Sequence, residues 1–325
     1  MKNKLPFFSV LIPNLGYSPF IFECLNSVIN QKTDNLFDYE IIFCDQSDIA
    51  VFNKIKKEIE SRYGSNKIKL IHSDVRGLLK ARHTLMKYCV GEYVQFVDSD
   101  DKLIECGLIK LYNQITIGNK PDIIITSLTK IASNGILTEK VELPALEKDD
   151  KILDYLLFTN KINSVVIKCF KKSLYSISDY QNFDVTNAED KLFSYPLVRK
   201  ANKIILNRNL SIYLYRYNPD SMTNKITISQ ARDSLFVLDI LLEKDFVLNN
   251  KQSFMFYNNF LYALTSYVSM LKRSTETKLI TQLVLDCREY CKKHNLLNVK
   301  VLGFKNKVKS FLFKHDFLNL LIKLC

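Results

Sequence analysis

Residues 91–101, GEYVQFVDSDD, are the stretch from which the fold can be worked out. Positions 93–97 are apolar or aromatic apart from one glutamine, which predicts a buried strand, and the strand runs directly into the acidic run 98–101. Three carboxylates within four residues repel one another in a dry environment but become favourable beside a divalent cation, and oxygen ligands suit Mg²⁺ or Mn²⁺. The competing interpretation is a solvated turn that caps the following helix.

Working outward from this stretch, short apolar runs alternate with helical patterns. The expected strands are 7–12, 40–44 and 67–72, and the expected helices are 19–31, 51–63 and 77–89. This alternation indicates βαβ units and an α/β fold with a mostly parallel, Rossmann-like central sheet and flanking helices. Such sheets bind ligands at the carboxyl ends of their strands.

Further along, 122–128 reads as a strand and 129–141 as a hairpin around the turn dipeptide Asn134-Gly135. Helices are expected at 149–159 and 188–200, and extended segments at 163–167, 204–206 and 211–216. After Asn218-Pro219 the pattern becomes helical, with three helices expected between 226 and 294. We therefore predict a catalytic domain over 1–222 and a helical, basic region over 223–325.

The charge of the chain is unevenly distributed. The net charge is +12, and residues 221–325 hold sixteen Lys and Arg against eight Asp and Glu. Such an excess favours a docking surface for something anionic, either nucleic acid or lipid headgroups. The last segment, 301–325, mixes lysines with apolar residues, which fits either an interfacial amphipathic helix or a helix packed on the body.

Other signals narrow the class of protein. Residues 1–6 lack the apolar core of a signal peptide, and no stretch reaches the roughly 18 apolar residues of a membrane span. The eight cysteines include no CxxC pair, which indicates reduced, mostly buried thiols and a cytoplasmic location. The absence of GxxxxGK[ST] excludes a P-loop NTPase.

Three segments in order resemble glycosyltransferase family 2, the inverting family whose catalytic domain has the GT-A fold. They are SVLIPNLGYSPFIFECLNSVINQ (9–31), GLLKARHTLMKYCVGEYVQFVDSDD (77–101) and NAEDKLFSYPLVRKANKIILNRNLSIYLYRYNPDSMT (187–223). With residues 40–47 the resemblance covers roughly 7–223. It implies a GT-A domain that binds a UDP-sugar.

The resemblance also implies roles for particular residues on the donor side. Asp100 would be the ligand of Mn²⁺ or Mg²⁺, with Asp98 near the ribose and the metal. Asp45 would hydrogen-bond the uracil, although Gln46 is an alternative because the family's paired aspartates appear here as Asp-Gln. The remaining donor contacts would come from Pro13 and Asn14 beside the base and from Arg82 facing the phosphates.

On the acceptor side, Asp190 matches the family's catalytic aspartate. A single carboxylate that accepts the proton of the acceptor hydroxyl, with in-line displacement, inverts the anomeric centre and gives a β-glycoside. The competing interpretation is that Glu189 and Asp190 only start a helix, where acidic residues favour the dipole. Arg216 would either face the donor pyrophosphate or pack as a surface arginine.

The resulting hypothesis is a hexosyltransferase that moves a sugar from a UDP-sugar, with UDP-glucose or UDP-galactose favoured, to a polyprenyl-diphosphate-linked saccharide. The product would belong to a surface polysaccharide such as an O-antigen or capsule, made at the inner face of the cell membrane by a peripheral enzyme, with the basic C-terminal third at an anionic lipid surface. A metal-dependent nucleotidyltransferase is an alternative, but residues 13–20 contain one glycine where a phosphate loop would need several. A basic binding module is another, but the phenylalanine spacing suits a helix face better than base stacking, so no nucleic-acid partner is expected.

Overall fold

The computed structural model describes residues 5–146, 151–177, 185, 187–218, 226–242, 247–272, 275–315 and 317–325. The chain divides into two compact units. The first comprises 1–147, 164–182 and 196–218, and the second comprises 148–163, 183–195 and 219–325. Each unit is thus built from three separate segments of the chain. The division into two domains at residue 222 stays a prediction.

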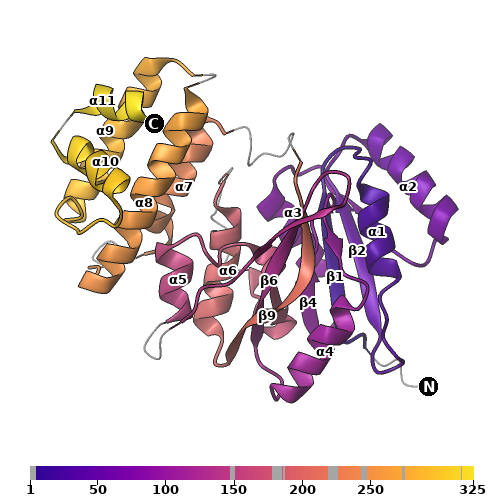
Figure 1. Cartoon of the computed structure of the whole chain (residues 1–325). Coiled ribbons are helices and arrows are strands. Elements are labelled where there is room, and N and C mark those ends of the chain that lie inside the picture. Colours follow the sequence, from indigo (N-terminus) through magenta and orange to yellow (C-terminus); the bar gives the residue numbers. More distant parts are fainter. Residues whose placement is uncertain are drawn as a thin grey trace. The chain divides into compact units, whose positions relative to one another are not determined.

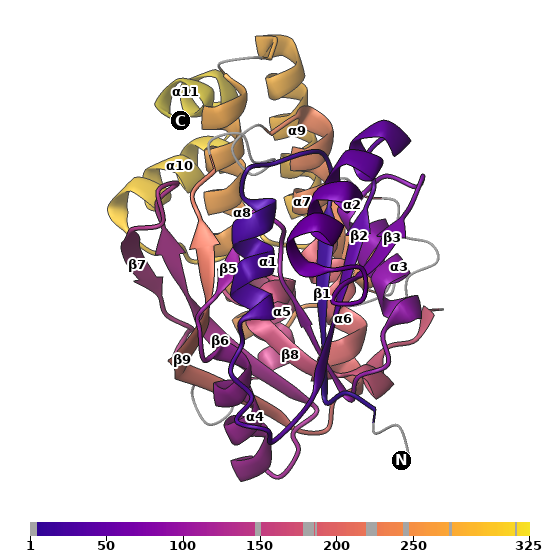
Figure 2. The same cartoon turned by 90° about the vertical axis from the view of Figure 1, so that its right-hand side faces the viewer.

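Nine strands form one mixed sheet in the described part of the first unit, in the order β3-β2-β1-β4-β8-β6-β9-β5, with β7 paired to β6 (Figures 1 and 2). The strands are β1 (Phe8–Asn14), β2 (Tyr39–Asp45), β3 (Lys69–His72), β4 (Tyr93–Phe96), β5 (Lys102–Leu103), β6 (Ile123–Ile131), β7 (Leu137–Val141), β8 (Lys168–Lys171) and β9 (Ile204–Arg216). β1 to β4 pair in parallel, while β8, β7 and β5 pair antiparallel to their neighbours. The predicted α/β class is confirmed. The sheet, expected to be mostly parallel, is mixed: β1 to β4 and the pair β6 and β9 are parallel, and the remaining pairs are antiparallel.

The parallel strands are buried because their sequences are nearly continuous apolar runs. Every residue of β1 and β4 is buried. Gly91, just before β4, allows the close approach of β1, since a Cβ there would lie 2.6 Å from the backbone nitrogen and the hydroxyl of Ser9. The Gly91 N–H instead donates to that hydroxyl at 2.8 Å.

Helices cover this sheet. They are α1 (Ile21–Ile29), α2 (Ile49–Tyr63), α3 (Leu78–Tyr88) and α4 (Gly107–Ile117). α3 packs against β1 and β2, α1 against β5, and α4 against β9 (Figure 2). Because β1, β2 and β3 run parallel, their carboxyl ends meet at one edge, where Asn14, Asp45 and His72 are register neighbours.

Two local expectations needed correction. The extended segment expected at 163–167 is a 3₁₀ turn (Val165–Ile167) followed by β8, and a second 3₁₀ turn covers Lys172–Leu174. The two short strands expected at 204–206 and 211–216 are one strand, β9, whose pairing with β6 contains register shifts. An irregularity of this kind hides the continuity of a strand, because it breaks the alternation of side chains.

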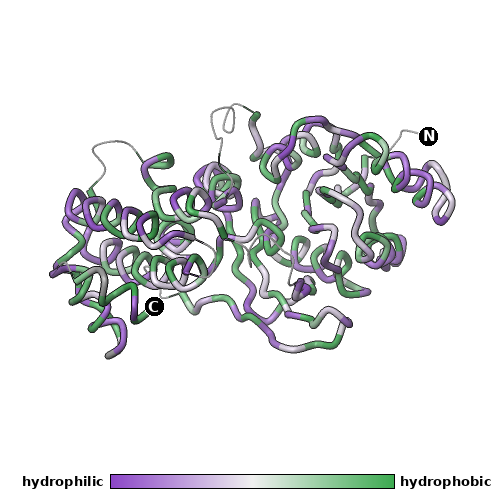
Figure 3. The backbone as a smooth tube through the Cα atoms, turned by 90° about the horizontal axis from the view of Figure 1, so that it is seen from above, coloured by the Kyte–Doolittle hydropathy of each residue, from purple (hydrophilic) through white to green (hydrophobic). Residues whose placement is uncertain are grey.

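The second unit is helical in its described residues. It contains α5 (Ile152–Phe158), the beginning of α6 (Glu189–Lys200), α7 (Ile228–Leu241), α8 (Asn250–Leu271), α9 (Thr277–Lys293), α10 (Phe304–Lys314) and α11 (Leu318–Leu324). Capping boxes start α7 at Thr227 and α8 at Asn249. Polar and apolar residues alternate along these helices, as Figure 3 shows. The three helices expected between 226 and 294 are confirmed, and the final segment forms two helices.

Candidate donor site

Asp45 lies at the end of β2 and is fully buried. Its Oδ1 accepts hydrogen bonds from Asn14 Nδ2 and from the Ser47 hydroxyl, both at 2.7 Å. Ser47 Oγ in turn accepts the N–H of Gly16 at 2.7 Å. Oδ2 of Asp45 is also buried and has no hydrogen-bond partner among the described residues. A buried carboxylate oxygen without a donor is costly, so this atom is suited to a ligand N–H.

Gln46, the alternative for base recognition, is engaged at both ends of its side chain. Its Nε2 donates to the carbonyl of Val75, and its Oε1 accepts the N–H of Gly77 at 3.1 Å. Gln46 therefore fixes the loop that precedes α3, while the side chain with an unpaired acceptor among the described residues is that of Asp45.

Arg82 lies on α3 and only about 1% of its surface is exposed. Its guanidinium is 3.7 Å from Oδ1 of Asp98 and lies over the ring of Phe96, 5.9 Å from the centroid. The structure thus brings Arg82 and Asp98 together at the carboxyl end of β4. The buried positive charge of Arg82 therefore faces the partly exposed carboxylate of Asp98.

Asp101 differs from the other two aspartates of the acidic run, because it is buried and committed to the fold. Its Oδ2 accepts from the Tyr213 hydroxyl and its Oδ1 from the Arg216 N–H, both at 2.6 Å. Burial raises the pKa of the Asp101 carboxyl well above its usual range, and the charges of Asp100 and Asp98 raise it further. Asp101 therefore anchors the acidic turn to β9.

Arg216, expected either to face the donor pyrophosphate or to pack as a surface arginine, is buried and bonded to other residues of the protein. Its side chain donates to the carbonyls of Asp100 at 2.9 Å and Ser133 at 2.6 Å, and to the carboxylate of Glu23 at 2.7 Å. It also lies 4.4 Å from the ring centroid of Phe20. The interpretation of Arg216 as a surface arginine is wrong, and its donors are used by protein acceptors.

Asp98 and Asp100 are the two carboxylates of the run that are partly exposed. Asn218 Nδ2 donates to Oδ2 of Asp100 at 3.3 Å. No group of three or more His, Cys, Asp or Glu side chains is arranged to hold a metal within the described ranges. Mg²⁺ needs only one or two protein carboxylates when phosphate oxygens complete its shell, so Asp98 and Asp100 fit a cation that binds with a diphosphate.

Asp190 lies in the first turn of α6, in the part of that helix that belongs to the second unit. Its neighbour Lys191 is almost completely buried, and its ammonium donates to the carbonyl of Leu157 at 3.0 Å. Burial lowers the pKa of Lys191 to about 8. The donor residues Pro13, Asn14, Asp45, Arg82, Asp98 and Asp100 belong to the first unit, so the catalytic role of Asp190 stays a prediction.

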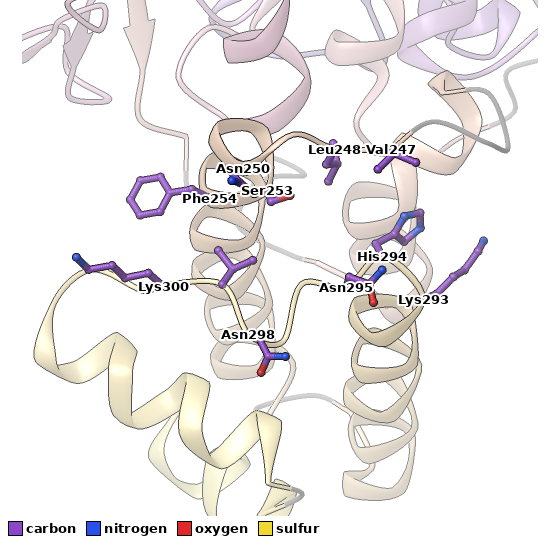
Figure 4. A pocket seen from close by; sticks show the side chains of 11 residues that line it. Val247, Leu248, Asn250, Ser253, Phe254, Lys293, His294, Asn295, Asn298 and Lys300 are labelled. Carbon is purple, nitrogen blue, oxygen red and sulfur yellow. The ribbon is translucent and has the colours of Figure 1, made fainter.

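The second unit holds a cavity of about 520 Å³ that contains none of the predicted site residues. Figure 4 shows Asn250 and Ser253 from α8, Lys293 from α9 and Lys300 from the following loop around it. The lining residues that the structure describes include no carboxylate, and none of the residues predicted to bind the donor is among them.

Sequence reasoning missed Ser47, Glu23 and Tyr213. Ser47 follows Asp45 by two residues, a spacing at which serine commonly bonds a nearby turn, so a local signal was present. Glu23 and Tyr213 reach Arg216 and Asp101 only through the fold, since Tyr213 is 112 residues from its partner. No local pattern could reveal them.

Solved structures of glycosyltransferases share the fold of this protein. The computed structure matches the crystal structure of Staphylococcus aureus TarS 1–349 in complex with UDP-GlcNAc, with a TM-score of 0.70 at 16% identity over 98% of this chain and 90% of that one. It also matches the mannosyltransferase PcManGT of Pyrobaculum calidifontis in complex with GDP-Man and Mn²⁺, with a TM-score of 0.54 at 13% identity over 95% and 88%. At such identities the likeness shows the fold, and the predicted GT-A fold is confirmed.

The family follows from the sequence match. The family model of glycosyl transferase family 2 covers residues 9–181, and the chain belongs to this family. The glycosyltransferase EpsJ of Bacillus subtilis is 27% identical over 225 residues, which are 67% of this chain and 63% of the relative. A poly(ribitol-phosphate) beta-glucosyltransferase of Bacillus spizizenii is 29% identical over 214 residues, 63% of this chain and 31% of the relative. The chain thus spans less than two thirds of either relative.

Proposed function

We propose that this protein is an inverting glycosyltransferase that moves a hexose from a UDP-sugar to a saccharide or polyol acceptor of a surface polysaccharide, forming a β-glycosidic bond. UDP-glucose and UDP-galactose are the favoured donors. The observation that carries the proposal is the open acceptor of Asp45 at the carboxyl edge of a GT-A sheet.

The chemistry of that acceptor supports a uracil base. Uracil carries one ring N–H, at N3, and Oδ2 of Asp45 offers a buried carboxylate oxygen without a partner among the described residues. A hydrogen bond to a charged group in such a place contributes about 1.5–3 kcal/mol. Asn14 and Ser47 hold the other oxygen, so the carboxylate is oriented before the base arrives. Pro13 lies in the same strand end, beside Asn14, where it would border the base.

Asp100, with Asp98 beside it, would hold Mn²⁺ or Mg²⁺, which supplies stabilisation of the negative charge on the departing nucleoside diphosphate. Other residues of the chain hold these two carboxylates in position. Arg82 orients Asp98, and Arg216 and Tyr213 fix the turn that presents Asp100. The proton of the acceptor hydroxyl would pass to the carboxylate of Asp190.

Two acceptors are candidates. A polyprenyl-diphosphate-linked saccharide at the inner face of the cell membrane fits the basic C-terminal region. A poly(ribitol-phosphate) chain is favoured by the names of several relatives, among them TarP of Staphylococcus aureus, which is 25% identical over 237 residues. In the described part of the chain, no helix is both long and apolar enough to span a bilayer.

The test is UDP release with Mn²⁺ from UDP-glucose, UDP-galactose, UDP-GlcNAc and UDP-GalNAc, with a lipid-diphosphate sugar or poly(ribitol-phosphate) as acceptor. We expect turnover of one donor by the wild type and its loss in Asp100→Ala. Glu105→Ala, which removes an exposed carboxylate paired with Lys32, is the matched control and should retain turnover. Absence of both turnover and Mn²⁺-dependent UDP binding in the wild type would overturn the proposal.

A further inference from the structure

The segment 301–325 has two sets of apolar residues, and only one of them packs on the body of its unit. Leu312, Phe313, Leu321 and Ile322 are buried. Polar contacts fix the same side, since the hydroxyls of Ser310 and Tyr257 lie 3.0 Å apart. The segment therefore packs as a terminal helix pair, which was one of the two readings of its sequence.

The other face remains exposed and is strongly apolar. Five large apolar residues, each between 49% and 58% exposed, lie in this short segment: Leu302, Phe311, Phe317, Leu320 and Leu324. Leu320 and Leu324, four residues apart, share one side of α11, and Phe317 immediately precedes that helix. The rings of Phe311 and Phe317 stack with centroids 6.3 Å apart, which joins the exposed face of α11 to that of α10. We call these five residues the apolar ridge.

Lysines accompany the apolar ridge. Lys305, Lys307 and Lys323 are exposed, and Lys309 and Lys314 are partly exposed. The segment 301–325 contains one acidic residue, Asp316, which lies outside the described residues. An apolar strip accompanied by cations on a surface helix is the pattern of a segment that lies in the interface of a bilayer, with side chains among the acyl chains and ammonium groups at anionic headgroups.

We propose that the apolar ridge is the face by which this protein docks on an anionic lipid bilayer. Phe311, Phe317, Leu320 and Leu324 enter the headgroup boundary, and the surrounding lysines contact the phosphates. A nucleic acid would match the lysines but leave the apolar ridge in water, whereas an anionic bilayer satisfies both. The inference deepens the proposed function by assigning the residues of its membrane contact, but the docking itself needs no catalysis.

The chain contains no tryptophan, so one introduced indole reports its own surroundings. We would place it by Phe311→Trp, with Tyr262→Trp at an exposed position of α8 as the control, in the full-length protein. Vesicles of phosphatidylglycerol and phosphatidylcholine should shift the emission of the first variant to shorter wavelength, and brominated lipid should quench it. The control should change little, and vesicles of pure phosphatidylcholine should act weakly on both.

Removal of the apolar ridge tests the same face by co-sedimentation with vesicles. Phe311→Ser/Phe317→Ser should bind phosphatidylglycerol vesicles roughly tenfold more weakly than the wild type, because two interfacial anchors are lost. The matched control, Ile117→Ser/Leu279→Ser, removes two exposed apolar residues elsewhere and should bind as the wild type does. Circular dichroism checks that each variant is folded.

The proposal is overturned if the two double variants bind equally, if the indole at position 311 is not quenched, or if the wild type does not bind anionic vesicles. It is also overturned if sedimentation velocity shows a dimer that Phe311→Ser/Phe317→Ser dissociates while vesicles are not bound, since the face would then join two copies of the chain. UDP release measured without lipid separates the two proposals. Vesicle binding without donor turnover would sink the proposed function and leave the docking face standing.

Discussion

At the scale of single residues, Oδ2 of Asp45 is the atom that most strongly indicates a binding site for a nucleotide base. Asp45 is held by Asn14 and Ser47 through Oδ1, and its Oδ2 is buried without a described partner. Such an arrangement is costly in the absence of a ligand and favourable when an N–H arrives. Recognition of the base is therefore a matter of one hydrogen-bond acceptor whose orientation is fixed in advance.

Asp45→Asn tests this acceptor with little change of shape. The amide oxygen can still accept from Asn14 and Ser47, while an NH₂ group takes the place of Oδ2 and meets the N–H of the base. We expect the Kd for UDP to rise by about 10- to 100-fold, the equivalent of the 1.5–3 kcal/mol of a charged hydrogen bond. Titration calorimetry with UDP and Mn²⁺ measures it. Asp74→Asn, at a carboxylate that is 95% exposed, is the control, and an unchanged Kd in Asp45→Asn would refute the role.

Lys191 provides a residue-scale prediction on pH. Burial lowers its pKa to about 8 from 10.5, so the unfolded chain binds more protons than the folded chain between these two values. The stability of the wild type therefore gains from Lys191 as the pH rises from about 8 to 10.5, and the charged ammonium costs most below pH 8.

Lys191→Met removes this titration. The unfolding free energy of the variant minus that of the wild type should fall by about 3 kcal/mol between pH 7 and pH 10.5. Urea unfolding of both proteins at each pH gives this difference, in which the other titrating groups cancel. A difference that stays constant between pH 7 and pH 10.5 would show that the pKa of Lys191 is not lowered in the folded protein. Ile117→Met, at an exposed residue that does not titrate, should give such a constant difference.

At the scale of elements, the acidic turn after β4 works because β9 holds it. Tyr213 on β9 donates to Asp101 and accepts the N–H of Asp98 at 3.1 Å, and Arg216 at the end of the same strand bonds the carbonyl of Asp100. The carboxylates left for a cation, Asp98 and Asp100, therefore project from a fixed turn. Two elements that are more than 100 residues apart in sequence make one functional feature.

Tyr213→Phe removes the hydroxyl from this support. The Asp101 carboxylate and the Asp98 N–H lose a buried partner, and we expect a loss of about 2 kcal/mol in unfolding free energy. Mn²⁺ should also activate UDP release at higher concentrations than in the wild type. Tyr217→Phe, at a side chain that is 60% exposed, should change neither quantity. Equal stability of the two variants would show that the turn does not depend on the Tyr213 hydroxyl.

At the scale of the whole molecule, the chain divides the proposed chemistry between two units. The donor residues belong to the unit with the sheet, and Asp190 belongs to the helical unit. Donor binding and proton transfer should therefore respond separately to substitution.

Asp190→Asn makes this separation measurable. We expect the Kd for UDP to stay within about twofold of the wild type, while kcat for transfer falls by roughly 10²- to 10⁴-fold because the general base is lost. Glu189→Gln, at the adjacent helical position, should keep most of the activity. Full turnover by Asp190→Asn would reject the assignment of the base.

The amino-acid sequence by itself determined the order and type of most elements in the first unit, because parallel buried strands are continuous apolar runs and their helices are amphipathic. It also located the acidic run at a strand end, where such folds bind ligands, and the resemblance to glycosyltransferase family 2 pointed to Asp45. The irregular strand β9 was missed, since its register shifts break the side-chain alternation.

Only the tertiary structure decided which of these side chains are available to a ligand. Local spacing does not tell that the side chains of Asp101 and Arg216 are bonded to partners at least 83 positions away, or that Gln46 is engaged while Asp45 has an unpaired oxygen. The tertiary structure likewise showed which apolar residues of 301–325 are buried and which are exposed. The physical reason is that helical and strand periodicity is a local property, whereas the burial and hydrogen bonding of a side chain depend on every element that packs around it.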